Sequence, residues 1–223
     1  MIPIDTTQKT SPDVRLLDAL SSENSSTRLQ AALAAGTHPD VRFVGTLVAR
    51  CAIEPDFYVR DMLTWALTRL PSASTVPSLL VELRSEVAQA RSQALHTLSK
   101  IGDGTAWPAI TRSLLHDADD EVARSAWRAA VVLVPDGERQ RLAEDLVAQL
   151  GRGDRKVRLS LSRALVALGD DAIRPALRTG LASADPEVSA HARATEQLSR
   201  DPDAGFDEAR RIVALGPERA GGA

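Results

Sequence analysis

The amino-acid sequence predicts an all-α fold, an α-solenoid in which about six helical hairpins stack into a right-handed superhelix. Three observations lead to this prediction. The composition is 43% hydrophobic but only 3% aromatic, which favours close-packed helices over a sheet sandwich. An apolar pattern recurs at intervals of about thirty residues, which is typical of helical-repeat proteins. Gly or Pro stands at the ends of many of these segments and separates one helix from the next.

The recurring pattern predicts one helix in each repeat. Five clear copies start 31, 32, 35 and 31 residues apart, and a shorter copy precedes them. Within a copy, apolar or small residues fall at offsets 0, 4, 7, 8 and 11 from its first residue, which is one face of an α-helix. The copies start at Thr27, Val59, Ala90, Val122, Val157 and Val188.

A second amphipathic segment precedes each copy, so each repeat is expected to hold a first and a second helix. Pro77 and Pro175 are expected in or near the first turn of first helices, where a missing N–H costs little. Gly36, Gly102 and Pro71 are expected to close second helices. The first helices are predicted at 14–20, 41–51, 76–83, 107–115, 142–150 and 173–181.

One solenoid domain is predicted over residues 12–215. It follows a flexible N-terminal segment, 1–11, and precedes a disordered tail, 216–223, in which Gly and Pro occur without apolar periodicity. Residues 206–215 are expected to add a last short helix that covers the end of the solenoid.

The repeated rhythm D-x-x-V-R-x-x-A-x-x-A-L-x-x-L-G, clearest from Val59, Ala90 and Val157, resembles the short HEAT-like repeats of the bilin-lyase type. The stretches 54–67, 90–103 and 121–130 also resemble helical-repeat domains attached to actinobacterial MerR-type regulators. No DNA-binding head is visible in the first 12 residues, so the resemblance implies an effector domain alone. Such likeness predicts architecture and leaves function open.

Composition narrows the classes of partner. The formal net charge is −3, so no global field draws the whole molecule to nucleic acid or to an anionic membrane. The single cysteine, Cys51, excludes an internal disulfide. Neither a signal peptide nor a membrane-spanning apolar run is present, so we expect a cytoplasmic protein that does not associate with membranes.

The candidate site lies on the exposed offsets of the second helices, which line the usual binding surface of a solenoid. Offsets 2 and 6 share one stripe of a helix, and offset 5 lies beside it. Across the repeats these positions carry an aromatic platform surrounded by hydrogen-bond donors, which suits an anionic or planar ligand. The predicted binding residues are Asp61, Trp65, His96, Arg124, Trp127, Arg128 and Arg163.

A structural interpretation of the same residues remains open at this point. Trp65 and Trp127 could fill gaps between second helices, and His96 could be a solvated surface residue. Arg60, Arg91 and Arg158 share offset 1, where the HEAT-like resemblance implies that arginine ties neighbouring turns together through acidic residues. These three arginines are therefore predicted to be structural.

Enzyme functions find little support in the sequence. The histidines show no i,i+4 pair and lie far from Cys51, so no zinc or haem site and no cofactor is predicted. The absence of a His-Glu dipeptide excludes the activity of the HEAT-like deoxyhypusine hydroxylases. The HEAT-like alkylpurine DNA glycosylases also carry Trp, Arg and Asp on a concave face, and bilin lyases share the repeat type.

The sequence therefore predicts a non-catalytic binding module that holds a protein segment or a small ligand on its concave face, with effector sensing as a possible regulatory role. The alternative is a protein that acts on nucleic acid, similar to the glycosylases, through the arginines between Arg124 and Arg163. A lesser alternative is tetrapyrrole handling similar to that of the bilin lyases.

Overall fold

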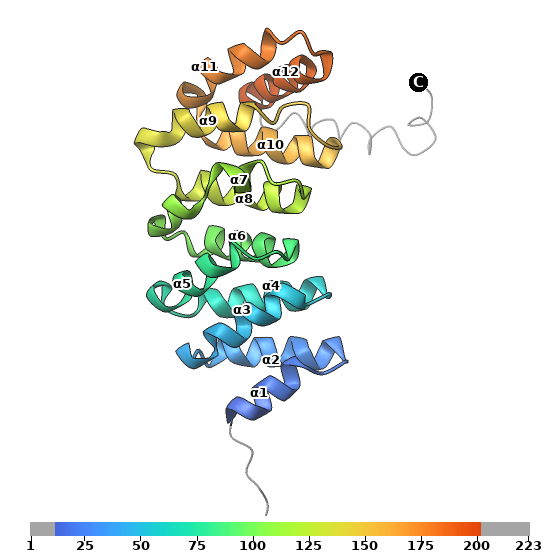
Figure 1. Ribbon diagram of the computed structural model, residues 1–223, viewed down its shortest axis with the longest axis vertical. Coiled ribbons are helices and arrows are strands. Elements are labelled where there is room, and N and C mark those ends of the chain that lie inside the picture. Colours follow the sequence, from blue (N-terminus) through green and yellow to red (C-terminus); the bar gives the residue numbers. More distant parts are fainter. Residues whose placement is uncertain (1–11, 202–223) are drawn as a thin grey trace, which may run out of the picture. The chain divides into compact units, whose positions relative to one another are not determined.

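The computed structural model describes residues 12–201, in which the regular elements are helices and no strand occurs (Figure 1). The predicted all-α solenoid fold class is confirmed. The chain divides into two compact units, unit 1 ending at Leu133 and unit 2 beginning at Val134. A single domain over 12–215 and the handedness of the superhelix stay predictions. The expected features at 1–11, 206–215 and 216–223 lie outside the described residues.

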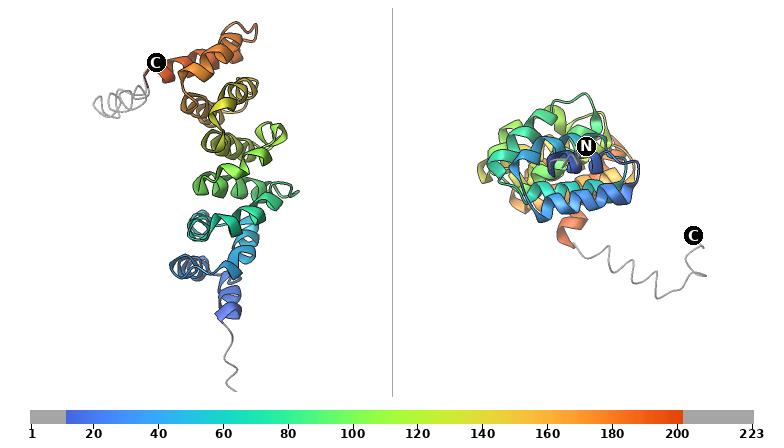
Figure 2. Two further views of the ribbon diagram at one scale, coloured as in Figure 1. Left: turned by 90° about the vertical axis from the view of Figure 1, so that its left-hand side faces the viewer. Right: turned by 90° about the horizontal axis from the view of Figure 1, so that it is seen from below.

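Unit 1 consists of two rows of helices. The second helices α2, α4, α6 and α8 pack in succession, and the first helix of each hairpin lies beside this row (Figures 1 and 2). The elements are α1 (Pro12–Leu20), α2 (Ser25–Thr37), η1 (Val41–Phe43), α3 (Val44–Ile53), α4 (Phe57–Thr68), α5 (Ser72–Glu82), α6 (Ala88–Ile101), η2 (Gly104–Ala109), α7 (Arg112–Leu115) and α8 (Asp120–Leu133).

Unit 2 repeats the same arrangement with two hairpins. Helix α9 packs on α11, the two first helices, and α10 packs on α12, the two second helices. The elements are η3 (Asp136–Glu138), α9 (Arg139–Val147), α10 (Arg155–Ala167), α11 (Asp170–Leu181) and α12 (Pro186–Arg200).

Acidic residues cap the second helices as their position before each copy suggests. The carboxylate of Asp56 accepts hydrogen bonds from the backbone N–H groups of Tyr58 and Val59 at the start of α4. Asp119 and Asp185 act in the same way at α8 and α12. These bonds satisfy N–H groups that have no partner inside the helix, so they fix where each second helix begins.

Some predicted boundaries were wrong. The helix expected at 107–115 is divided into the 3-10 helix η2 and the short helix α7, because Pro108 supplies no N–H and disfavours α geometry in the residue before it. Helices α5 and α11 begin at Ser72 and Asp170, before the predicted starts at 76 and 173, so Pro77 and Pro175 lie inside them, just beyond the first turn. Gly102 does end α6 in a left-handed conformation, with φ of 70°, but Gly36 lies within α2.

Arginines at offset 1 tie successive repeats together. Arg91 of α6 pairs with Asp117 at 3.0 Å, and Arg158 of α10 pairs with Glu187 at 2.6 Å, which confirms their predicted structural role. Arg60 donates instead to the carbonyls of Glu54 and Pro55, at 2.8 Å each. This set of contacts lies at the ends of the helices, away from offset 6.

Candidate functional site

The stacking of second helices brings offset 6 of successive repeats side by side in unit 1. This position is occupied by Leu33 on α2, Trp65 on α4, His96 on α6 and Arg128 on α8. The side chains of Leu33 and Trp65 are each 38% exposed, His96 is half-buried and Arg128 is exposed. We call the surface formed by Leu33, Asp61, Trp65, His96, Lys100, Arg124 and Arg128 the second-helix face.

Trp65 is anchored on one side and open on the other. Its ring covers Gly36 of α2 so closely that a Cβ atom on that glycine would lie 2.2 Å from Cζ3 of the indole. The absence of a side chain at position 36 therefore lets the ring lie flat against the neighbouring helix. A fixed aromatic side chain that remains partly exposed loses little conformational entropy when it contacts a ligand.

His96 lies within electrostatic range of charged groups on three successive helices. Burial lowers the pKa of His96, and the charges of Arg128 on α8 and Lys100 on α6 lower it further, while Asp61 on α4 acts in the opposite direction. The predicted register of Asp61, His96 and Arg128 is thus supported by their mutual influence. His96 is neutral at pH 7 and lies in a positive environment.

Arg124 and Arg128 place two guanidinium groups next to each other on α8. Arg124 donates from Nη1 to Glu121, while its Nε is buried and has no acceptor among residues 12–201. Arg128 donates to the carbonyl of Arg124 at 3.3 Å and to Oγ of Ser125 at 3.1 Å. Burial lowers the pKa of Arg128 and the neighbouring charge of Arg124 adds to this effect, while the charge of Glu121 acts in the opposite direction. Within the described chain, Arg128 has no carboxylate partner.

Trp127 does not belong to this surface, and its predicted binding role was wrong. Its side chain is fully buried, and the indole N–H donates to the carbonyl of Leu115 at 2.8 Å. Offset 5 points into the core because α7 packs on that side of α8. Arg163 is exposed on α10 and belongs to unit 2, whereas the other predicted residues belong to unit 1.

Two members of the second-helix face, Leu33 and Lys100, are not among the predicted binding residues. Leu33 occupies offset 6 of the shorter copy at Thr27, and Lys100 lies one turn after His96. Applying the offset rule to the first copy would have found Leu33. By contrast, Ser92 at offset 2 is only 9% exposed and bonds to Oγ of Ser125 at 3.0 Å, so the stripe is not open on every helix.

Unit 2 contains a Ser-His pair that resembles a catalytic dyad but has the wrong hydrogen-bond directions. Nε2 of His191 lies 3.1 Å from Oγ of Ser162 and 3.0 Å from the carbonyl of Arg158. Nδ1 accepts the backbone N–H of Gly151 at 3.0 Å, so the proton of the neutral ring is on Nε2. Nε2 therefore donates and cannot take the proton of the serine hydroxyl.

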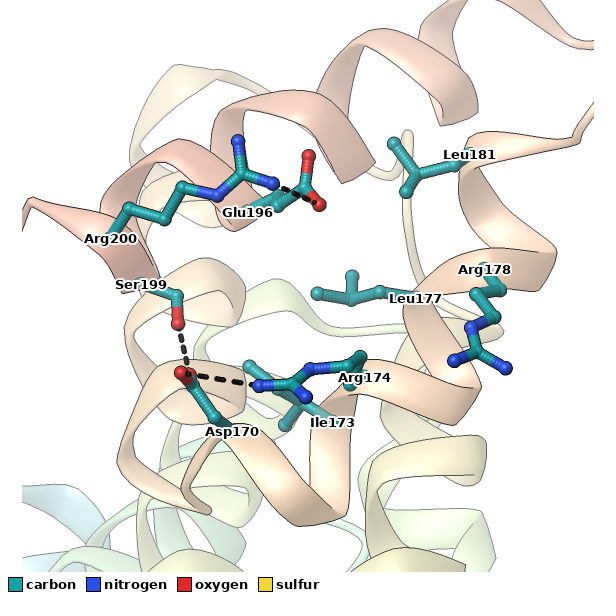
Figure 3. A pocket seen from close by; sticks show the side chains of 9 residues that line it. All are labelled: Asp170, Ile173, Arg174, Leu177, Arg178, Leu181, Glu196, Ser199 and Arg200. Atoms are coloured by element: carbon teal, nitrogen blue, oxygen red, sulfur yellow. Dashed lines mark hydrogen bonds and ion pairs between the residues drawn. The ribbon is translucent and has the colours of Figure 1, made fainter.

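A groove of about 460 Å³ lies between α11 and α12 of unit 2 (Figure 3). Arg200 pairs with Glu196 at 2.8 Å, and Arg174 lies 3.9 Å from Asp170. Arg178 extends from α11 and has no ion pair with any described residue. The groove is lined by Asp170, Ile173, Arg174, Leu177, Arg178, Leu181, Glu196, Ser199 and Arg200.

The described residues contain neither a candidate metal site nor a candidate membrane-spanning helix. No group of three or more His, Cys, Asp or Glu side chains between residues 12 and 201 is placed to hold a metal ion. None of the helices in that range combines the length and the apolar character needed to span a bilayer.

One family model matches part of the chain. Residues 44–130 are similar to the family model of HEAT repeats. The matched segment runs from the start of α3 into α8 and includes Asp61, Trp65, His96, Arg124 and Arg128. The resemblance to MerR-associated domains stays a prediction. A search of curated proteins found no match.

Three solved structures are similar to this chain over most of its length. One engineered protein shares 23% identity with a TM-score of 0.47, covering 83% of this chain and 95% of its own. A second engineered protein shares 17% identity with a TM-score of 0.47, covering 86% and 99% respectively. The complex of CpcE and CpcF of phycocyanin lyase from Nostoc sp. PCC7120 shares 19% identity with a TM-score of 0.48, covering 89% of this chain and 80% of that one.

Proposed function

We propose that this protein is a non-catalytic binding module that holds a segment of a partner protein on the second-helix face of unit 1. The observation that carries the proposal is the placement of Trp65, His96 and Arg128 at equivalent positions of three successive helices. Trp65 supplies exposed aromatic surface, and the electrostatic influence of Arg128 on His96 supports their proximity. HEAT repeats provide a scaffold suited to such binding.

The length of the second-helix face favours a protein segment over a small ligand. Packed helices lie about 8–10 Å apart, so Leu33 on α2 and Arg128 on α8 are separated by about 25–30 Å across three helix spacings. An extended chain advances about 3.3 Å per residue, and about eight residues would cover this distance. A small ligand would contact only one part of the surface.

The chemistry of the second-helix face also changes from one end to the other. Leu33 and Trp65 provide apolar area on α2 and α4, whereas Lys100, Arg124 and Arg128 provide positive charge on α6 and α8. Such a gradient distinguishes the two ends of a bound segment, because an apolar anchor and a charged residue each have a preferred position.

The test is a comparison of Trp65→Ala with Leu159→Ala. Leu159 is 41% exposed on α10 and serves as a matched apolar truncation on unit 2. We expect Trp65→Ala to keep its helical circular dichroism and most of its thermal stability but to lose the proteins that wild type captures from lysate, as identified by mass spectrometry. Leu159→Ala should retain them.

Two results would contradict the proposal. If Trp65→Ala fails to fold, Trp65 is a core residue and the surface has no aromatic anchor. If both variants capture the same proteins as wild type, the partner binds elsewhere. Binding of duplex or single-stranded DNA that weakens steeply with salt would favour the nucleic-acid alternative instead.

A further inference from the structure

We infer that the α8 end of the second-helix face is an anion-binding site, in which Arg124 and Arg128 receive a carboxylate side chain of the bound segment. This inference rests on the proposed function and names the chemistry of the partner. The segment would place an apolar residue on Leu33 and Trp65 and an acidic residue on the two arginines.

Positive side chains outnumber negative ones around this end. Positive charge comes from Arg124 and Arg128 on α8 and from Lys100 on α6. Glu121 pairs with Arg124 and also acts through its charge on Arg128, and Asp61 lies on α4, the helix next to α6. Two positive groups, Arg128 and Lys100, thus have no ion pair with any residue in 12–201. A carboxylate from outside would neutralise this excess.

Arg128 has unused hydrogen-bonding capacity toward an anion. It donates only to neutral oxygens, at 3.3 and 3.1 Å, and its side chain is exposed, whereas Arg124 already pairs with Glu121 through Nη1. A guanidinium group forms its strongest contacts with a carboxylate in two-pronged geometry. Arg28 and Arg91 at offset 1 satisfy this preference inside the protein, but Arg128 does not.

The distance between Trp65 and Arg128 determines how far apart the apolar and acidic residues of the partner segment should be. Trp65 on α4 and Arg128 on α8 are two helix spacings apart, about 16–20 Å. An extended chain covers this distance in about five or six residues. The partner segment should therefore carry a large apolar residue and an acidic residue with that separation.

His96 lies on α6, between the helices that carry Trp65 and Arg128, and its pKa should change when an anion binds. The groups that act on it are Arg128 from α8, Lys100 from α6 and Asp61 from α4. A carboxylate bound at Arg128 would offset the positive charge that lowers the pKa of His96, so the pKa should rise on binding. By linkage, binding should become tighter as the pH falls through the range in which His96 gains its proton.

The experiment uses the full chain and three synthetic peptides of ten residues, each with Leu and, six residues later, a position that is varied. The varied position carries Glu, Gln or phosphoserine. We expect the Glu peptide to bind at least about tenfold more tightly than the Gln peptide at low salt and to raise the pKa of His96, followed by NMR of its imidazole. Arg128→Gln should abolish the preference for Glu, whereas Arg163→Gln, at the same offset in unit 2, should keep it.

The outcomes separate this inference from the proposed function. If Glu and Gln peptides bind equally and both are lost in Trp65→Ala, the binding surface stands and the anion site is wrong. If only the phosphoserine peptide binds, the carboxylate assignment is wrong. If no peptide binds, or if Trp65→Ala binds them all unchanged, the proposed function is contradicted as well.

Discussion

In unit 1, arginines at two positions of the repeat differ in their hydrogen-bond and ion-pair partners. At the loop ends of the helices, Arg28 and Arg91 each pair with a carboxylate 26 residues later in the chain and also donate to carbonyls of the preceding loop. On the second-helix face, Arg128 has no carboxylate partner within the described residues. At offset 1, Arg28 and Arg91 are paired with carboxylates inside the stack, whereas at offset 6 Arg128 is exposed and makes no such pair with a described residue.

Glu54 is the buried carboxylate that pairs with Arg28. Its side chain is 0% exposed and accepts from Arg28 Nε and Nη2 at 2.8 Å each, from Arg50 and from the backbone N–H of Asp56. Burial raises the pKa of Glu54, but the hydrogen bonds from Arg28, Asp56 and Arg50 outweigh it and bring the pKa to about 2. The carboxylate therefore joins α2, α3 and the start of α4.

Glu54→Ala should have the largest effect on stability. It leaves Arg28, which is 6% exposed, buried without its carboxylate, and breaking a buried pair on one side costs about 3–5 kcal/mol. Urea unfolding followed by circular dichroism measures the loss. Glu187→Ala, which removes an exposed partner of Arg158, is the matched control and should cost less than about 1 kcal/mol. Equal losses would mean that burial does not distinguish the two pairs.

Acid should weaken the same contact. Because folding lowers the pKa of Glu54 from 4.5 to about 2, its contribution is present above pH 4.5 and is lost as the pH falls toward 2. The wild type should lose about 3 kcal/mol from this group over that range. Glu54→Gln should lose less over the same interval, as measured by urea unfolding at several pH values. Parallel stability curves for the two proteins would show that Glu54 titrates normally.

Much of the fold could be predicted because helical periodicity and caps are local properties. The copies at Val59, Ala90 and Val157 correspond to α4, α6 and α10, and the structural role of Arg91 and Arg158 followed from their shared offset. The break between η2 and α7 was not predicted, since the helix expected at 107–115 has Pro108 at its start, whereas Pro108 interrupts the segment in the structure.

The site was predictable only in part because exposure depends on the neighbouring helix. Offset 6 is open on the helices that carry Trp65 and Arg128, as expected, but offset 5 at Trp127 faces α7 and is buried. The sequence pattern also does not predict that Trp65 packs on Gly36, a contact between residues of different repeats. Such contacts depend on how two helices pack and not on the pattern within either one.

Gly36→Ala should displace the Trp65 side chain of the second-helix face. The new Cβ would meet the Trp65 ring at 2.2 Å and the Ala66 backbone at 3.0 Å, so the indole must move and stability should fall by about 1–3 kcal/mol. A change in Trp fluorescence and weaker partner capture should accompany this loss. Gly45→Ala is the control, since nothing lies within 4 Å of its added Cβ and helix propensity favours Ala by about 1 kcal/mol. Unchanged fluorescence and capture in Gly36→Ala would mean that this contact does not position Trp65.

Arg158→Gln should have the smallest effect, although Arg158 occupies the same repeat position as Arg28. The side chains of Arg158 and Glu187 are 35% and 63% exposed, whereas those of Arg28 and Glu54 are 7% and 0% exposed. Water and salt screen an exposed pair, so its loss should cost less than about 1 kcal/mol and should shrink further at high salt. Arg28→Gln, measured beside it in urea at low and high salt, should lose several times more and should show little dependence on salt. If the two variants lost the same stability, offset alone would determine the strength of these ties, and the exposure of each pair would have no influence.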